Sequence, residues 1–316
     1  MSGASSPWGP RQTRLALALL VIVTALSPVL PSPVLVLDQS RWWADAAVVA
    51  PFLLAVVVAG GIDLSCGSIL ALSGVTLVRL HAEAGLPMGW AALAGLAIGT
   101  AAGALNGIVI AAGRIPDLVV TLATLAIYRG LAQAVGGNRV YSNLPEAYRW
   151  IGEGSLFGVI PAPWLVVLAA WLAAHGILHW SRLGRQAFAL GSSPRGARLA
   201  RVPVARTRIL LYSLSGLAAG IASVLHTARS NTARSDDAIG LELEAMAAVV
   251  LGGASIAGGR GSAPGVFIAV LCLGLVRTGL MLLGIPELWQ RMSAGIVLIG
   301  VAILNERAMI RRRSLP

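Results

Sequence analysis

The stretch "AGGIDLSCGSILALSGV", residues 59–75, places one aspartate in an otherwise apolar run. Gly60 and Gly61 precede Asp63, and Gly67 follows it. A carboxylate held away from water is costly unless other groups pair with it. Glycines allow the backbone to turn and allow helices to approach one another closely. The stretch therefore predicts a break between two apolar helices, with the aspartate at the break.

The composition is that of a protein that crosses a membrane several times. Of the 316 residues, 57% are hydrophobic and 12% are charged, and the mean hydropathy is +0.80. A soluble globular protein has about 25% charged residues, which it needs to solvate its surface. We therefore expect an all-α, polytopic membrane protein.

The apolar runs divide into about ten transmembrane helices, and the shorter runs predict broken helices near 60–67 and 257–262. Residues 181–208 contain seven arginines and no acidic residue, which is typical of a cytoplasmic loop. Arginines near both chain ends predict that the N- and C-termini are also cytoplasmic. The predicted spans are 14–32, 45–61, 66–80, 88–113, 117–135, 162–181, 207–228, 242–257, 263–283 and 289–305.

The chain shows no linker and no soluble module, so we expect residues 1–316 to form a single transmembrane domain. Within it, residues 182–208 form the main cytoplasmic loop. Residues 136–161 form the main extracytoplasmic loop, which mixes both charge signs with aromatic residues.

Several function classes are disfavoured. The formal charge is +11, but the arginines lie in loops between apolar runs, which indicates membrane topology rather than nucleic-acid binding. The chain has no P-loop and no HExxH or CxxC spacing, so we expect no enzyme activity. His175 and His179 are four residues apart without a carboxylate or thiol nearby, which is a weak metal site, and we expect no metal.

Polar residues inside the apolar runs remain as candidates for function. At membrane depth such residues usually face the bundle interior or a water-filled path. The alternative for the charged ones is a structural ion pair. The candidates are Asp63, Asn106, Asp117, Thr121, Thr124, Arg129, Gln133, Glu242, Glu244 and Arg277.

A weak internal similarity links two glycine-rich segments. "VVVAGGIDLSCGS" (56–68) and "VVLGGASIAGGRGS" (249–262) both run from valines into a Gly-Gly pair and a turn of small residues. The similarity is either chance or a pair of discontinuous helices that face a central path.

Three segments resemble the signatures of a known family. They are "GGIDLSCGSILALSG", "GRIPDLVVTLATLAIYRGLA" (113–132) and "GLELEAMAAVVLGGASIAGGRGS" (240–262). Their order and spacing resemble the permeases of sugar-type ABC importers (the ribose, xylose, arabinose and galactose group), within a superfamily that also holds branched-chain amino-acid permeases. The resemblance covers about 40–305. The "ARSD" in residues 226–245 looks more like the rhamnose and autoinducer-2 branch.

The resemblance implies a coupling helix and a path. In residues 184–204 a short helix, opened by Pro194, would dock into the ATPase subunit. The coupling residues would be Pro194, Arg195, Ala197, Arg198, Leu199 and Ala200. The path and helix-break residues would be Gly60, Gly61, Asp63, Ser65, Gly67, Asn106, Thr121, Thr124, Gly252, Gly253, Gly258, Gly259 and Gly261. Asp63 would cap the helix that follows, gate the path or touch the sugar.

The resemblance also implies partners. They are a separate ABC ATPase that carries ATP and Mg, a second permease subunit, a periplasmic sugar-binding protein and the lipid of the bacterial inner membrane. No cofactor is expected on this chain. The expected function is import of a monosaccharide or similar small polyhydroxy solute. The alternatives are a branched-chain amino-acid permease and an ion-coupled secondary transporter.

Overall fold

The structure is a computed structural model that describes residues 32–137 and 139–286, together with residues 21, 289, 290, 292, 295, 296, 299 and 300. The predicted span 14–32 therefore lies almost entirely outside the described residues, and the predicted span 289–305 lies partly outside them.

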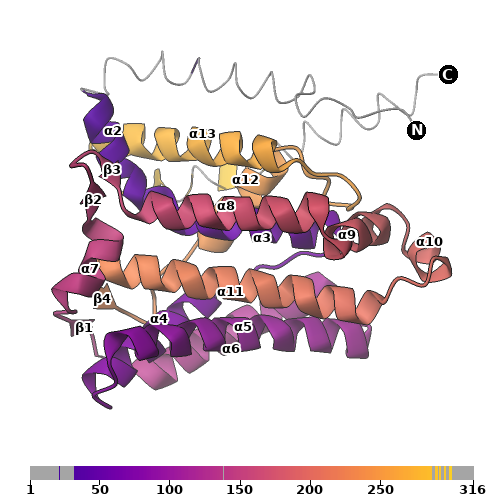
Figure 1. Cartoon of the computed structure of the whole chain (residues 1–316), viewed down its shortest axis with the longest axis horizontal. Coiled ribbons are helices and arrows are strands. Elements are labelled where there is room, and N and C mark those ends of the chain that lie inside the picture. Colours follow the sequence, from indigo (N-terminus) through magenta and orange to yellow (C-terminus); the bar gives the residue numbers. More distant parts are fainter. Residues whose placement is uncertain are drawn as a thin grey trace.

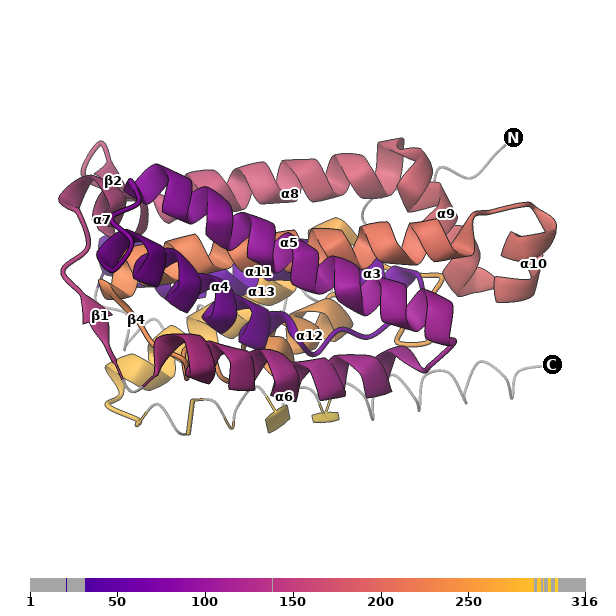
Figure 2. The same ribbon diagram turned by 90° about the horizontal axis from the view of Figure 1, so that it is seen from below.

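The described chain is a bundle of helices that run side by side, with a few two-residue strands at one end (Figures 1 and 2). The long elements are α3 (Ala44–Val58), α4 (Cys66–Ala82), α5 (Met88–Gly113), α6 (Asp117–Gly136), α8 (Pro163–Trp180), α11 (Val204–Ser230), α12 (Leu241–Leu251) and α13 (Ala263–Leu282). The expectation of an all-helical protein is confirmed.

Six helices in the described part are long and apolar enough to cross a membrane: Pro33–Val58, Met88–Gly113, Asp117–Gly136, Pro163–Trp180, Val204–Ser230 and Ala263–Leu282. The apolar helix α4 is shorter. The count of ten spans and the orientation of the termini stay predictions.

One end of the bundle, called here the α7 end, carries the short elements α2 (Pro33–Gln39), η1 (Ser40–Trp43), β1 (Tyr141–Ser142), α7 (Glu146–Glu153), β2 (Ser155–Leu156), β3 (Ile160–Pro161) and β4 (Thr232–Ala233). β1 pairs with β4, and β2 pairs with β3, both antiparallel. The opposite end, called the α10 end, carries α9 (Arg182–Ser192) and α10 (Pro194–Leu199) (Figure 1).

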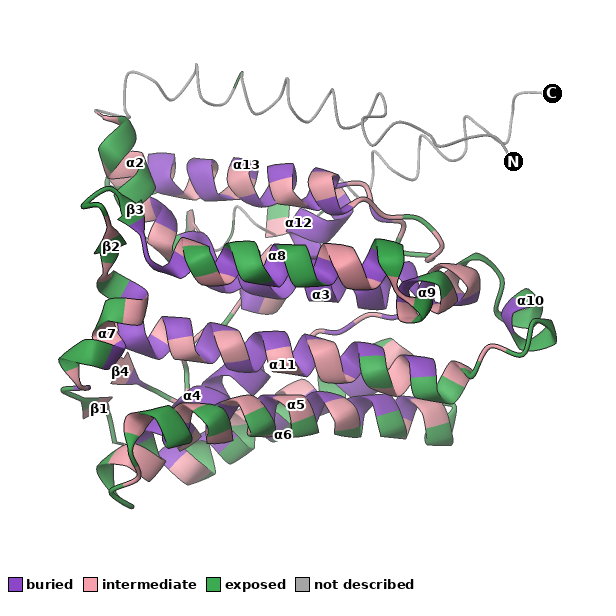
Figure 3. Cartoon of the chain, in the orientation of Figure 1, coloured by how far each residue is buried: buried purple, intermediate pink, exposed green. Residues whose placement is uncertain are grey.

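The core lies around α3, whose residues are all buried. In contrast, α5, α6 and α8 each expose a row of apolar side chains, which is the surface that lipid requires (Figure 3). Glycines bring α5 and α11 close together: a Cβ on Gly103 would lie 2.1 Å from the Tyr212 carbonyl oxygen, and one on Gly216 would lie 2.1 Å from that of Gly99. Small residues commonly mediate such contacts between membrane helices.

Two predicted boundaries were wrong. The span predicted at 242–257 ends at Leu251, so the second break covers residues 252–262. The helix stops there because Gly253 takes a φ of 101°. Gly252, at the helix end, packs on the Val266 backbone with no room for a side chain. The first break covers residues 59–65 rather than 60–67. Gly67 lies in the first turn of α4, where a Cβ would come 2.2 Å from a carboxylate oxygen of Glu242.

Candidate functional site

The first helix break is built around the carboxylate of Asp63, which is fully buried. One oxygen accepts hydrogen bonds from the backbone N–H (2.9 Å) and hydroxyl (2.6 Å) of Ser65. The other oxygen accepts a bond from the Ser215 hydroxyl of α11 at 2.7 Å. Ser65 itself occupies the N-cap position of α4, so Asp63 bonds to the residue just before the helix. These contacts favour positioning of the break over contact with a solute.

A chain of hydrogen bonds links this break to α5 and α6. The Asn106 amide donates to the Ser65 hydroxyl at 2.8 Å. The Tyr128 hydroxyl donates to the Asn106 side-chain oxygen at 3.0 Å and also lies 2.9 Å from the Ala102 carbonyl oxygen. Asn106, Ser65 and Tyr128 are all buried. A buried network whose members are all paired holds its backbone in one arrangement.

The start of α6 and the first half of α11 enclose the same break. The Thr121 hydroxyl donates to the Ile62 carbonyl oxygen at 3.2 Å. Asp117 accepts hydrogen bonds from the Tyr212 hydroxyl at 3.0 Å and from Arg208 at 3.2 Å. Gly61 is required here, since a Cβ would lie 2.8 Å from both the Asp117 carboxylate and the Tyr212 hydroxyl.

Thr124, the other threonine predicted on the path, is buried and bonds within α6 to the Thr121 carbonyl oxygen at 3.3 Å. Sequence reasoning found Asp63, Ser65, Asn106 and Thr121 but missed their partners. Ser215, Tyr128 and Tyr212 are also polar groups in apolar runs, and that signal could have identified them.

The two breaks meet at a contact made almost entirely of backbone, which we call the glycine junction (Val58, Gly60, Gly191, Gly258 and Gly259). The Gly259 N–H donates to the Val58 carbonyl oxygen at 2.8 Å. A Cβ on Gly258 would lie 2.9 Å from the Cα atoms of both Gly60 and Gly191. A Cβ on Gly191 would lie 1.9 Å from the Val58 oxygen and 2.4 Å from the Gly259 nitrogen. Helix α9 therefore ends between the two breaks.

The other glycines of the second break also allow close packing. A Cβ on Gly261 would lie 2.6 Å from the Val58 side chain and 2.7 Å from that of Leu54. Gly191 was not among the predicted residues. Its sequence context, in an arginine-rich loop, carries no signal that it packs against glycines more than 60 positions away.

The predicted coupling segment follows the junction directly. Only Ser192 and Ser193 separate Gly191 from α10. The helix begins at Pro194, and the Ser193 hydroxyl caps it by accepting the Gly196 N–H at 3.1 Å. A six-residue helix forms here because its cap and its proline both favour this start.

Most residues of α10 are exposed. Leu199 is 87% exposed, Arg195 and Arg198 are exposed, and Ala200 follows the helix end, whereas Ala197 is buried. The exposed surface of α10 therefore combines one leucine with two arginines.

The α7 end holds a group of charges, which we call the charge cluster: Asp45 and Arg229 are buried, and His226 and Asp237 are partly buried. Arg229 donates two hydrogen bonds to the Asp45 carboxylate, at 2.7 and 3.1 Å. The His226 ring places Nδ1 2.8 Å from Asp45 and Nε2 3.6 Å from Asp237. None of these four residues was predicted, although opposite charges at the ends of apolar runs could have suggested a pair.

The charged candidates near α12 take part in structural contacts. Arg129 of α6 donates to the carbonyl oxygens of Ser235 (2.8 Å) and Asp237 (2.7 Å). Arg277 donates to Glu244 at 3.3 Å. Glu242 accepts the N–H of Gly240 at 3.1 Å, and Gln133 is exposed. For Arg277 and Glu244 the alternative of a structural ion pair is therefore the better interpretation.

Among the described residues, no group of three or more His, Cys, Asp or Glu side chains could hold a metal ion. The rings of His175 and His179 lie 4.5 Å apart, next to Trp180 and Phe188.

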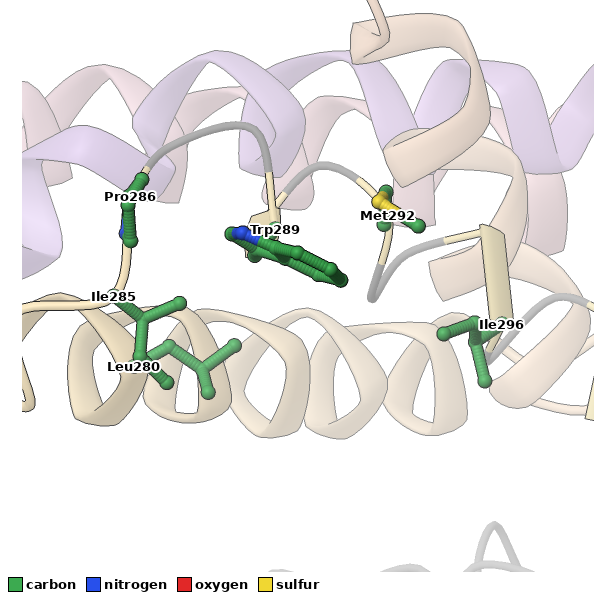
Figure 4. Close-up of a pocket in the computed structure, with 6 residues that line it drawn as sticks. All are labelled: Leu280, Ile285, Pro286, Trp289, Met292 and Ile296. Atoms are coloured by element: carbon green, nitrogen blue, oxygen red, sulfur yellow. The ribbon is translucent and has the colours of Figure 1, made fainter.

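An apolar hollow of about 530 Å³ lies beside the end of α13, lined by Leu280, Ile285, Pro286, Trp289, Met292 and Ile296 (Figure 4). A sugar is held by several polar groups placed to bond its hydroxyls. The side chains that line this hollow are apolar or aromatic, so it does not have the chemistry of a sugar site.

Comparison with known proteins places the chain in a family. The profile described as "Branched-chain amino acid transport system / permease component" matches residues 46–302. The chain belongs to this family of transport permeases and is a multi-pass membrane protein.

Three relatives with known names are similar to this chain over most of its length. The ribose import permease RbsC of Bacillus subtilis (strain 168) is 35% identical over 291 residues, which cover 92% of this chain and 89% of the relative. RbsC of Escherichia coli (strain K12) is 36% identical over 299 residues, covering 92% of each chain. The autoinducer 2 import system permease LsrD of Photorhabdus luminescens is 35% identical over 291 residues, covering 90% of this chain and 86% of the relative. No solved structure matches the chain. The predicted family is confirmed.

Proposed function

We propose that this chain is the transmembrane permease subunit of an ATP-driven importer, which moves a monosaccharide or similar small polyhydroxy solute across the bacterial inner membrane. The relatives are import permeases for ribose or for autoinducer 2, which supports a solute of that kind over branched-chain amino acids. The observation that carries the mechanism is the position of Gly191, which lies between the two helix breaks and is separated from α10 by two residues.

In this proposal the chain performs no chemistry and binds no nucleotide. A separate ATPase subunit, carrying ATP and Mg, contacts α10 and moves it. Because α9 ends in backbone contact with both Val58 and Gly259, a shift of α9 displaces both breaks at once. The ends of α3 and α13 then move together, which changes the side of the membrane to which the path is open.

The topology follows from the arginines. The α10 end holds the seven arginines of 181–208 and would be cytoplasmic, with ten spans and both termini on that side. The α7 end would then face the periplasm and receive the sugar-binding protein. A second permease subunit would complete the path.

The Asp63 network has a structural part in this proposal. Its carboxylate has no exposed surface and three donors within the chain, so its role is to hold the shape of the first break. Solute selection would rest on the binding protein, and the permease would supply a path rather than a tight site.

The docking role of α10 is tested by Leu199→Asp. The side chain is 87% exposed, so the substitution leaves the fold intact while placing a charge in the expected ATPase contact. We expect the ATPase to copurify less and uptake into proteoliposomes to fall, with binding of solute to the binding protein unchanged. Ile115→Asp is the matched control, because Ile115 is exposed in the α5–α6 loop of the same end. Equal uptake by Leu199→Asp and the control would refute the coupling role.

The solute class is tested separately. The cognate binding protein is titrated with ribose, other pentoses, autoinducer 2 and leucine by calorimetry. Binding of a polyhydroxy compound supports the proposal, whereas binding of leucine alone would contradict it.

A further inference from the structure

The β2–β3 hairpin at the α7 end has an aromatic tip in an unfavourable conformation. Ser155 pairs with Pro161 and Leu156 with Ile160, and the Val159 N–H donates to the Leu156 carbonyl oxygen at 3.1 Å. The turn between them places Phe157 at φ 53° and Gly158 at φ 72°. Glycine, asparagine and aspartate are the usual residues at such positions. A phenylalanine there carries backbone strain that a glycine would avoid.

The same tip is exposed to a degree that is unusual for apolar side chains. Phe157 is 95% exposed, and Val159 and Ile160 are 44% and 47% exposed. Contiguous exposed apolar residues of this kind mark a contact with another molecule or with a membrane. A strained backbone that presents an aromatic ring outward is therefore a feature that needs a partner.

The hairpin lies next to the lipid-facing side of a membrane helix. The Ala162 N–H donates to the Gly154 carbonyl oxygen at 2.8 Å, which ties the base of the hairpin to the start of α8 (Figure 3). Along α8 an outward row of leucines begins within one turn, at Leu165, and continues through Leu168 and Leu172. The hairpin with the apolar tip is thus joined at its base to a helix that exposes a row of leucines.

Tryptophans at the same end mark the level of a membrane boundary. Trp42 of η1 and Trp150 of α7 are about half exposed, and Trp164 of α8 donates to the Ser40 hydroxyl at 2.6 Å. Tryptophan is enriched at the interface between headgroups and acyl chains. Trp164 follows the end of β3 by three residues, so the hairpin adjoins an aromatic residue of the kind found at that interface.

The charge pattern favours lipid over a protein partner. Residues 154–164, "GSLFGVIPAPW", contain no charged side chain. Protein contacts made by a diffusing partner generally use a polar and charged rim that guides association. An uncharged segment with an aromatic tip is suited to the interfacial layer of a bilayer.

We propose that the β2–β3 hairpin is an interfacial lipid anchor, with Phe157 inserted at the boundary between headgroups and acyl chains at the α7 end. The anchor holds α7 at a fixed depth. Helix α7 in turn packs on α11, where the Tyr148 hydroxyl lies 2.6 Å from that of Thr227. The anchor thereby sets the position of the end of α11 that carries the charge cluster.

The test uses a nitroxide spin label on Val159→Cys in the full chain, reconstituted with its partner subunits in phosphatidylethanolamine–phosphatidylglycerol liposomes. Cys66 and Cys272 are buried and serve as unlabelled background. Accessibility is measured with oxygen, which partitions into lipid, and with a nickel chelate, which stays in water. Labels at Ser142→Cys and Leu168→Cys, both at exposed positions, provide the water and lipid references.

We expect the label at 159 to be more accessible to oxygen than the label at 142, and several-fold less accessible to the chelate. Adding Phe157→Ser should move the 159 label towards the water reference, while Phe157→Trp should leave it unchanged. Phe157 touches little within the chain, so both variants retain the fold. A 159 label that matches the 142 label, or that is unaffected by Phe157→Ser, would overturn the proposal. A label that becomes protected only when the binding protein is added would assign the hairpin to protein docking instead, and would leave the coupling function untouched.

Discussion

The two ends of α3 are held by opposite kinds of contact. At the α7 end, Asp45 in the first turn of α3 is paired with Arg229 and His226 inside the charge cluster. At the α10 end, the carbonyl oxygen of Val58, the last residue of α3, accepts a hydrogen bond from the Gly259 N–H and lies close to Gly191 in the glycine junction. Buried ion pairs are directional and expensive to separate, whereas the glycine junction joins its segments through close backbone packing and the hydrogen bond from Gly259 to Val58.

This difference indicates which end of the bundle moves. Helix α3 has 15 residues, is about 22 Å long and contains Pro51, at which a helix can bend. Because the charge cluster holds its first turn, a displacement of α9 should move the α10 end of α3 more than the α7 end. The α7 end would then change shape less than the α10 end in each transport cycle.

The largest effect is expected for Asp45→Ala. The change leaves Arg229 and His226 buried without their shared carboxylate, so we expect a loss of about 3–5 kcal/mol in the free energy of unfolding. Thermal unfolding in detergent measures it. The control is Asp236→Ala, which removes a pair with Arg234 in which both side chains are 53% exposed and which contributes about 0–1 kcal/mol. Similar losses in both variants would mean that the charge cluster does not fix this end.

Gly191→Ala tests the glycine junction at the α10 end. The added Cβ would lie 1.9 Å from the Val58 oxygen, so it must push the two breaks apart. We expect a loss of stability of about 1–3 kcal/mol and a larger relative loss of coupled uptake, about tenfold. Uptake and ATP hydrolysis in proteoliposomes are measured together. Gly130→Ala is the control, because nothing lies within 4 Å of its Cβ position. If the two variants transport equally well, the junction does not transmit motion.

Asp63→Ala tests the region between the two ends. It removes the acceptor for the Ser65 N–H and for two hydroxyls, at a cost of about 1–3 kcal/mol. We expect uptake of every transported solute to fall by the same factor, with Asp63→Asn intermediate because it keeps one acceptor oxygen. Competition uptake with two solutes measures the factor. A change confined to solute preference would contradict the structural role of Asp63.

The smallest effect is expected for Glu83→Gln, at the surface of the α7 end. Glu83 contacts Arg79 at 2.8 Å, Arg139 at 2.7 Å and Tyr141 at 2.8 Å, and the hydrogen bond from Arg79 holds the pKa of Glu83 below its ordinary value. A lowered pKa stabilises the folded chain above the ordinary value of 4.5, and this contribution is lost as the pH falls through the lowered pKa. Thermal unfolding of wild type and variant should therefore differ slightly at pH 7 and converge in acid. A large difference at pH 7 would show that exposed charges, and not only the charge cluster, hold this end.

Much of the architecture follows from local composition. The prediction of α5 at 88–113 was correct, and so was the start of α6 at Asp117. A proline precedes each helix and marks its start, and the length of the apolar run indicates the length of the helix. The sequence "GSSPRGARLA" was sufficient to predict a helix that starts at Pro194, since its cap and its first residue are adjacent in the chain. The positions of the two breaks were predicted to within a few residues, because glycine changes the backbone conformation at its own position in the chain.

Contacts between residues that are distant in the sequence could be identified only from the tertiary structure. Asp45 and Arg229 are 184 positions apart, and nothing in either segment specifies that they meet. Gly191 stands in an arginine-rich loop, and its contact with Val58 and Gly259 depends on how α9 turns back onto the bundle. Helix α12 ended before the predicted boundary because Gly253 takes a positive φ, and hydropathy does not report backbone conformation. Hydropathy and turn chemistry report the surroundings of a residue along the chain, whereas which helix end is held by charges and which by glycines depends on packing in three dimensions.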